Sequence, residues 1–422
     1  MSVPATATGV VPAAPPPTTK RRIPTWTLLA AVPGVLLVLA VLETVTDAHD
    51  LASSGTIAAT LVATTPIMLA GLGGLWSERA GVVNIGLEGM MILGTYGAGY
   101  FGYHHGAWAG VLGAIAMGMV GGLLHAIATV IFGVDHIISG VAINIIALGA
   151  VQYLASLTFV GLPGGGSTQS PKIPDVPTLT IDSLSDKLGD IEKDDTFFVS
   201  QLAALLRALC TNLSSLVLIS LVILVLSWFV LWRTSFGLRL RSCGESPAAA
   251  ESLGVHVLRY KFAAVLVSGA MAGLAGGVLA MVASSNYRDG QTGGRGYIGL
   301  AAMIFGNWRP GGLLMGSGLF GYTQTLGLRQ GGTSVHALLL AVAVLALALA
   351  LVQLRQGKRV GALVVAVAGL AIGAVYFGID EVPGDFTNMT PYVITLVVLA
   401  FASQRLRMPA ADGQIYRKGS AG

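Results

Sequence analysis

The sequence predicts an all-α, polytopic membrane protein, and three observations lead to that fold class. Of the 422 residues, 54% are hydrophobic and only 10% are charged, whereas a soluble globular domain carries roughly 25% charged residues. Apolar runs repeatedly reach about 18–20 residues, the length that a helix needs to cross a bilayer. The 57 glycines suit membrane helices, because small residues let neighbouring backbones approach closely.

The chain divides into a membrane domain, residues 23–407, between two tails. Residues 1–22 are rich in Pro, Ala and Thr without apolar periodicity, which predicts a disordered tail. Residues 408–422 are expected to form a second tail. The apolar run that follows Arg22 is too long for a signal peptide and lacks a small-x-small cleavage site, so it is expected to remain as the first helix.

Within the membrane domain, apolar segments alternate with polar connections. The segment at 297–306 is too short to span a bilayer and is expected to be a broken or re-entrant helix. The apolar segments are expected at about 25–45, 56–76, 82–102, 107–132, 137–159, 213–232, 261–283, 297–306, 312–328, 336–354, 360–379 and 389–404.

Charge alternates with these segments in a way that sets the topology. Cationic loops are expected in the cytoplasm, so both termini are placed there and the chain is assigned to the cytoplasmic (plasma) membrane, the inner membrane of the cell. No extended basic face is present, which argues against nucleic-acid binding. The cationic clusters are Lys20, Arg21 and Arg22; Arg233, Arg239, Arg241, Arg259 and Lys261; Arg355, Lys358 and Arg359; and Arg405, Arg407, Arg417 and Lys418.

The third segment opens with two polar residues, Asn84 and Glu88. Their spacing predicts a shared helical face. A carboxylate in an apolar segment costs about 2.5–3.5 kcal/mol on insertion scales and usually faces a bundle interior or a pathway. Glu88 is therefore either a pathway or gate residue, or a structural carboxylate. In the structural role it would pair with Arg79, with a group on another subunit, or with backbone at a helix break. Nine residues of helix rise ~13 Å, which disfavours the Arg79 pair.

The fifth segment begins with Asp135 and His136 and carries Asn144 further in. Asp135 and His136 are expected to cap the helix end. Asn144 is a candidate to line the pathway.

A polar stretch at 161–200 interrupts the apolar pattern and contains Pro171, Pro174 and Pro177. It is expected to be extracytoplasmic, either as a contact surface for a binding protein or as a flexible connector. Cys210 and Cys243 are expected near opposite membrane faces, which excludes a disulfide between them. Tryptophans near helix ends, Trp308 among them, are expected to be interfacial anchors.

The loop 233–260 is expected to carry a short capped helix. Ser246 suits the N-cap, Pro247 the first helical position and Gly254 the position past the end. A helix of about seven residues is unstable alone in water, so it is expected to dock against another protein. The alternative is a capped surface turn. The residues assigned to this docking loop are Gly244, Glu245, Ser246, Pro247, Ala248, Ala249, Glu251 and Gly254.

An internal repeat is also visible. The stretch GVVNIGL at 81–87 is echoed 213 positions later by the similar stretch GRGYIGL at 294–300, and Met90 then matches Met303. The loop before the first copy is expected inside and the loop before the second outside, so the two halves are predicted to be inverted. The pathway is then expected between the repeats, with Asn84, Glu88, Asn144 and Tyr297 as its candidate residues.

Several motifs in the same order resemble the permease subunits of ABC importers for nucleosides and simple sugars, the group related to ribose and branched-chain amino acid importers. They are NIGLEGMM, IISGVAIN, the loop LRSCGESPAAAESLGV, GRGYIGLAAMIFGNWRPGG and MTPYVITLVVLA. The resemblance covers about residues 56–407. Val255 departs from the Ile of the family's loop pattern, and the N-terminal tail and outer loop are longer.

The resemblance implies a type II importer-like fold with roughly ten membrane helices in two inverted repeats. It implies a second permease subunit, related or identical, two cytoplasmic ABC ATPases that push on the short loop helices, and an extracytoplasmic substrate-binding lipoprotein. The chain would then catalyse no reaction and need no cofactor or metal. Its sequence has no Gly-x-x-x-x-Gly-Lys-Ser/Thr loop, so ATP is expected on the partner. The alternative is an ion-coupled secondary transporter of a small polar solute, with Glu88 carrying a proton.

Overall fold

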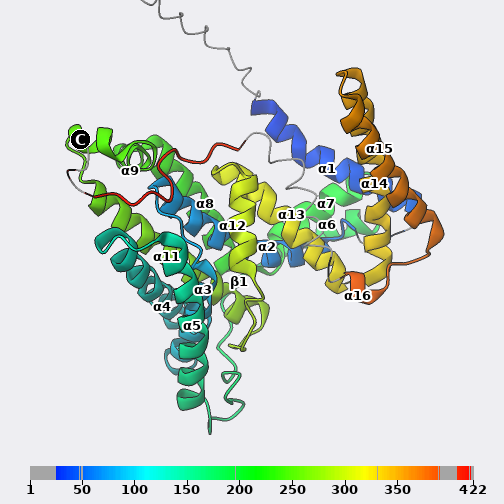
Figure 1. The fold of residues 1–422 in the computed structure, drawn as a ribbon. Helices are drawn as coiled ribbons and strands as arrows, with labels where there is room; N and C mark the ends of the chain where they lie inside the picture. The colour runs from blue at the N-terminus through cyan, green and yellow to red at the C-terminus, as the bar shows by residue number, and fades with distance from the viewer. Residues whose placement is uncertain are drawn as a thin grey trace, which may run out of the picture.

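The computed structural model describes residues 25–46, 48, 51–194, 196–329, 331–387, 389, 406–417 and 419. The expected tail 1–22 and all but Met389 of the expected apolar segment 389–404 lie outside these residues. Helices dominate, as the composition predicts, so the expectation of an all-α membrane protein is confirmed (Figure 1). The two strands of the described chain, β1 (Thr178–Leu179) and β2 (Leu213–Ser214), form one short antiparallel pair.

The described helices follow the apolar segments closely. They are α1 (Thr25–Thr46), α2 (Ser54–Arg79), α3 (Leu87–His105), α4 (Ala107–Ala126), the π-helical turn η1 (Ile127–Ile131), α5 (His136–Thr158), α6 (Asp182–Lys193), α7 (Val199–Cys210), α8 (Ser215–Arg233), α9 (Ser235–Glu245), α10 (Pro247–Ser252), α11 (Val257–Val278), the π-helical turn η2 (Leu279–Ala283), α12 (Arg295–Phe305), α13 (Pro310–Arg329), α14 (Gly331–Arg355), α15 (Arg359–Gly378) and α16 (Gly384–Thr387).

Seven helices of the described chain are long and apolar enough to cross a membrane: α2, α4 with η1, α5, α8, α11 with η2, α14 and α15. The helix α12 has only 11 residues and ends in a turn before α13, which confirms the expectation of a short segment there. Both π-helical turns come at the ends of spanning helices.

The helices α2 and α11 pack against each other and are the two most buried candidate spans of the described chain. Figure 1 places α2, α12 and α13 between a group that includes α3, α4, α5 and α11 and a second group that includes α1, α14 and α15. In the apolar stretch of α11, 72% of the residues are buried, against 11% in α15. The outer helices therefore present their apolar faces to lipid, whereas α11 is enclosed by protein.

Glycines let the central helices touch backbone to backbone. Gly273 on α11 lies between Gly94 of α3 and Gly118 of α4. A Cβ atom on Gly118 would lie 2.4 Å from the carbonyl oxygen of Gly269, far inside van der Waals contact. This packing explains much of the glycine content, because only residues without a side chain permit so close an approach.

The polar stretch 161–200 is more structured than a flexible connector. It contains α6 and the start of α7, and the two helices pack together. The Arg207 guanidinium lies 2.8 Å from the Glu192 carboxylate, which also accepts the Ser54 N–H at 2.8 Å. Burial favours a raised pKa for Glu192, but these hydrogen bonds and the guanidinium charge lower its pKa overall. The helix pair is thus tied to the start of α2. Both cysteines are free thiols, as expected.

The glycine packing gives a direct test. Replacing Gly118 with Ala is expected to lower the stability of the purified protein by about 1–3 kcal/mol, because the new methyl group overpacks a backbone contact. A Cβ atom on Gly149 of α5 would meet no other atom within 4 Å. Gly149→Ala is therefore the matched control and should raise stability by up to about 1 kcal/mol, because Ala favours a helix more than Gly does. The measurement is thermal unfolding in detergent. Equal melting temperatures for the two variants would contradict the packing account.

Candidate functional site

The chain unwinds between α2 and α3. Residues 80–86 are not helical, and α3 begins only at Leu87. The expectation that Asn84 and Glu88 share a helical face is therefore wrong, because Asn84 lies in the break and Glu88 in the first turn of α3. Gly81 has a φ of +82°, a left-handed conformation that favours glycine. The break ends helix α2 and redirects the chain into α3.

Side chains from three other helices satisfy the backbone of this break. Lys261 Nζ donates to the Gly81 carbonyl at 3.0 Å. The two histidines bind the two backbone groups of Val83: His125 Nε2 lies 3.0 Å from its carbonyl oxygen, and its N–H donates to His136 Nδ1 at 3.3 Å. This assignment requires a proton on His125 Nε2 and none on His136 Nδ1. Nonhelical backbone is tolerated at membrane depth only when protein groups satisfy it in this way.

Asn84 completes the pairing inside the break. Its side-chain oxygen accepts the Gly86 N–H at 3.0 Å, and its Nδ2 donates to Ser268 Oγ on α11 at 2.8 Å. Asn84 is fully buried. Its contacts fix the turn into α3 and connect that turn to α11.

Glu88 binds the backbone at the start of α12. Its two carboxylate oxygens accept the N–H groups of Gly294, at 2.9 Å, and Gly296, at 2.7 Å. Gly294 is the N-cap residue of α12, so Glu88 satisfies two of the donors that every helix leaves unpaired at its N-terminus. Of the alternatives left open by the sequence, the geometry matches hydrogen bonding to backbone at a helix break. Arg79 does not pair with Glu88; it donates to the Trp308 carbonyl at 2.7 Å.

Asn144 connects the same two helix starts from α5. Its Oδ1 accepts the Gly89 N–H at 2.7 Å, and its Nδ2 donates to the Ile85 carbonyl at 3.1 Å and to the Tyr297 hydroxyl at 2.8 Å. Tyr297 is 46% exposed. Asp135 caps α5, as expected, by accepting the N–H groups of Ile137 and Ile138.

The N-termini of α3 and α12 therefore meet at one place. A Cβ on Gly296 would lie 2.6 Å from the backbone nitrogen of Glu88, so only glycine allows this approach. Glu88 and Asn84 are enclosed, whereas Asn144 and Tyr297 keep partial exposure beside them. The accessible groups are thus an amide and a phenol, which together offer hydrogen-bond donors and acceptors to a polar, uncharged solute.

The short helix expected in loop 233–260 is present as α10, from Pro247 to Ser252. Ser246 occupies the N-cap position, but its hydroxyl makes no capping hydrogen bond. At the other end, Gly254 has a φ of +82° and donates to the Glu251 carbonyl at 2.8 Å. Leu253 beside it is 84% exposed. A large apolar side chain held this openly at a helix end suits contact with another protein.

The end of α9, which leads into α10, packs against the break. A Cβ on Gly244 would lie 2.4 Å from the Arg79 carbonyl oxygen and 3.0 Å from the Gly81 nitrogen. The Glu245 carboxylate lies 3.8 Å from the Arg79 guanidinium. The end of α9, directly before α10, is therefore in contact with the α2–α3 break.

Two residues of this region lie where the sequence does not predict them. The sequence favours a membrane interface for Trp308, but the residue is 3% exposed and donates from Nε1 to Glu78 at 2.5 Å. Lys261 belongs to a cationic loop cluster in the sequence, yet it is buried. The signal in the sequence that could have predicted a buried Lys261 is Gly81. If the helix unwinds at this glycine, its free carbonyl groups require buried donors from other helices.

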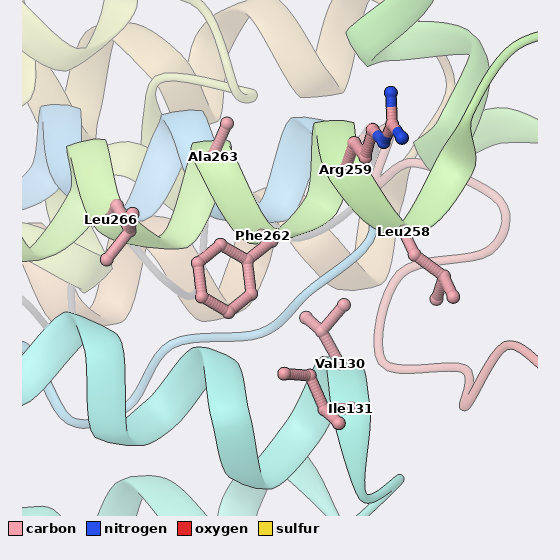
Figure 2. Close-up of a pocket in the computed structure, with 7 residues that line it drawn as sticks. All are labelled: Val130, Ile131, Leu258, Arg259, Phe262, Ala263 and Leu266. Atoms are coloured by element: carbon pink, nitrogen blue, oxygen red, sulfur yellow. The ribbon is translucent and has the colours of Figure 1, made fainter.

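An apolar cavity of about 440 Å³ lies apart from these residues, between η1 and α11. Figure 2 shows Phe262 and Leu258 directed toward Val130 and Ile131, while Arg259 points away from them. None of the four pathway candidates lines it. In the described part of the chain, no group of three or more His, Cys, Asp or Glu residues is arranged to hold a metal ion.

Comparison with known proteins decides the family. The family model described as the permease component of the branched-chain amino acid transport system matches residues 56–352. The chain belongs to this permease family. The resemblance seen in the sequence motifs is thereby confirmed at the level of the family.

Curated relatives of this permease agree with that assignment. The guanosine ABC transporter permease protein NupQ of Bacillus subtilis (strain 168) is 34% identical over 86% of this chain and 96% of its own length. The nucleoside ABC transporter permease protein NupC of Lactococcus lactis subsp. cremoris (strain MG1363) is 32% identical over 85% of this chain and 95% of its own. The putative glucose ABC transporter permease protein TsgC13 of Haloferax volcanii is 33% identical over 67% of this chain and 80% of its own length. No solved structure matches the chain.

The capping role of Glu88 can be tested. Glu88→Gln keeps one acceptor oxygen and leaves an N–H of Gly294 or Gly296 unpaired, so stability is expected to fall by about 1–3 kcal/mol. Thermal unfolding of the purified permease is the measurement. Asp190→Asn is the control, because the Asp190 side chain is 79% exposed and makes only a surface ion pair. If both variants melted like the wild type, Glu88 would not hold the two helices together.

Proposed function

We propose that the chain is the membrane-spanning permease subunit of an ATP-driven ABC importer that moves nucleosides across the cytoplasmic membrane. The observation that carries the proposal is the direct contact between the end of α9, at Gly244 and Glu245, and the α2–α3 break, at Arg79 and Gly81. The names of the nucleoside-transporting relatives support the choice of solute. A simple sugar is the second candidate, because the glucose permease relative is comparably similar.

In this proposal, α10 is the docking element for the ATPase. Its exposed Leu253 and Ala249 form the contact, and nucleotide-driven movement of the ATPase displaces α10. The displacement passes through Gly244 to the backbone at Arg79 and Gly81. The break passes the displacement on to the start of α3, where Glu88 is hydrogen-bonded to the N-terminus of α12. The chain itself carries out no hydrolysis.

Solute recognition is assigned to the meeting point of α3 and α12. Asn144 and Tyr297 are its accessible polar groups, and their mutual hydrogen bond of 2.8 Å can be exchanged for bonds to a solute. Nucleosides and sugars both offer hydroxyl groups, and nucleosides add a flat base that can stack on an aromatic ring. Asn84 and Glu88 act behind this surface by holding the helix ends.

The wider architecture follows the family plan. We infer roughly ten membrane helices in two inverted repeats, because the break before α3 and the start of α12 carry the repeated sequence and meet at their N-termini. A second permease subunit, related or identical, two ABC ATPases and an extracytoplasmic substrate-binding lipoprotein complete the importer. Both termini are placed in the cytoplasm, and α6 and α7 with their flanking loops are placed outside.

The energy source separates this proposal from an ion-coupled transporter. The complete importer, expressed with its ATPase, second permease subunit and binding protein, is expected to take up radiolabelled guanosine into proteoliposomes only with ATP. Uptake should be unchanged by a proton or sodium gradient. Uptake by the purified chain alone, powered by an ion gradient, would establish the alternative. Competition by unlabelled glucose instead of nucleosides would move the assignment to sugars.

The docking role of α10 has its own test. Ala249→Trp is expected to reduce uptake at least about tenfold without changing membrane insertion, because the indole blocks the close approach of the ATPase at an exposed helix position. Ala371→Trp on α15 is the matched control, since it places the same side chain on an exposed position of a peripheral helix. Uptake and the amount of assembled complex are measured together. Normal uptake by the Ala249 variant would exclude α10 as the docking element.

A further inference from the structure

The C-terminal segment returns to the part of the molecule where α9 and α10 lie. Figure 1 shows it, in red, running beside α9. Its backbone is held at three positions: the Arg407 N–H donates to Asn307 Oδ1 at 2.7 Å, the Ala410 N–H to Glu245 Oε2 at 3.3 Å, and the Ala411 N–H to the Gly244 carbonyl at 2.8 Å. The described part of the expected tail 408–422 is therefore in contact with α9. We call residues 406–417 the strap.

The far end of the strap holds α10 itself. The Tyr416 hydroxyl donates to the Glu251 carboxylate. The Tyr416 ring also packs on the small apolar cluster of Cys243, Ala250 and Val257, which joins α9, α10 and α11. This tyrosine therefore fixes the docking helix by a charge-assisted hydrogen bond and by apolar contact.

The middle of the strap covers the α2–α3 break. A Cβ on Gly81 would lie 3.1 Å from the Ala411 carbonyl oxygen, and a Cβ on Gly413 would lie 3.5 Å from Val83. The strap thus touches both the break and the docking helix, which are the two ends of the route along which movement is proposed to travel.

Asp412 is buried where the strap meets the break. It is 8% exposed, and its carboxyl group lies beside that of Glu78 on α2. The other ionisable groups that face it are Arg79 of α2 and Lys261 of α11. Burial raises the pKa of Asp412 to about 7, against the lowering effects of the interaction with Glu78, of the Gly413 backbone and of the two cationic side chains. Burying a carboxylate costs free energy, so a tail that made no specific contact would leave Asp412 in water. Its burial indicates that the strap is docked.

We propose that the strap is a positioning element, which holds α10 at a fixed place relative to the α2–α3 break so that movement of the ATPase is passed to the pathway rather than lost in α10. Tyr416 is the principal positioning residue. This inference rests on the proposed function, because it assumes that α10 receives the force. It assigns a role in coupling to residues 406–417, at the C-terminal end of the described chain.

Tyr416→Phe tests the strap, since it removes the hydroxyl and keeps the ring. Hydrogen exchange of residues 406–417 in the complete importer is expected to accelerate about tenfold, because a charge-assisted hydrogen bond is lost. The number of solute molecules moved per ATP hydrolysed is expected to fall about fivefold. The control is Tyr376→Phe on α15, which Figure 1 places at the opposite end of the molecule from α9; both readouts should match the wild type.

Asp412→Asn is expected to strengthen docking of the strap, which is the opposite of the effect expected for Tyr416→Phe. The pKa of Asp412 is higher in the docked strap than its ordinary value of 3.8, so docking binds a proton and weakens as the pH rises toward 7. The amide carries no charge, so the variant is expected to raise the protection factor of the strap at pH 7–8, which is the intrinsic exchange rate at that pH divided by the observed rate. The dependence of this protection factor on pH between 5 and 8 is expected to weaken, with Glu78 as the remaining buried carboxyl. Equal pH dependence in the variant and the wild type would overturn the placement of Asp412.

Two outcomes would overturn the positioning role. The first is unchanged exchange and an unchanged transport ratio in Tyr416→Phe. The second is a lower melting temperature in Tyr416→Phe with an unchanged transport ratio, which would make the strap a purely structural contact. Failure of the proposed function is a separate result: the wild-type importer would then show no ATP-driven uptake, whereas the exchange measurement requires no transport.

Discussion

The structure depends on one constraint: the unwound backbone of residues 80–86 lies within an apolar protein and must find its hydrogen-bond partners there. Each backbone group left unpaired in such a place costs several kcal/mol. Lys261, His125, His136 and Asn144 supply partners from three different helices. The positions of α4, α5 and α11 around the break are thereby fixed. The same groups bring the start of α3 to the start of α12, where the candidate site forms.

Much of this architecture can be predicted from the sequence, because the membrane imposes a simple rule on helix length and apolarity. The spans, the short segment α12 and the capped helix α10 follow from that rule and from the cap residues around Ser246 and Gly254. The start of α3 at Leu87 cannot be predicted in this way. Val82, Val83 and Ile85 are as apolar as the residues of a membrane helix, so the hydropathy pattern does not reveal the break. Its only local signal is Gly81, whose φ of +82° becomes visible in three dimensions.

The candidate site could be predicted only in part for a related reason. Asn84, Glu88, Asn144 and Tyr297 stand out because polar groups are expensive in apolar segments, and the structure does bring them together. Asn144 and Glu88 bind backbone groups far away in the sequence, at Ile85 and at Gly294, and backbone carries no signature in a sequence. The same reason explains why the burial of Trp308 and Lys261 is not predicted from the sequence. Composition does not reveal the buried partners, Glu78 for Trp308 and the Gly81 carbonyl for Lys261.

The contact of Gly273 with Gly94 and Gly118 has a consequence for movement. Backbones that interlock without side chains between them have no layer that can rearrange, so one helix cannot slide past another without a clash. The helices α3, α4 and α11 are therefore expected to move together as one rigid unit during a transport cycle.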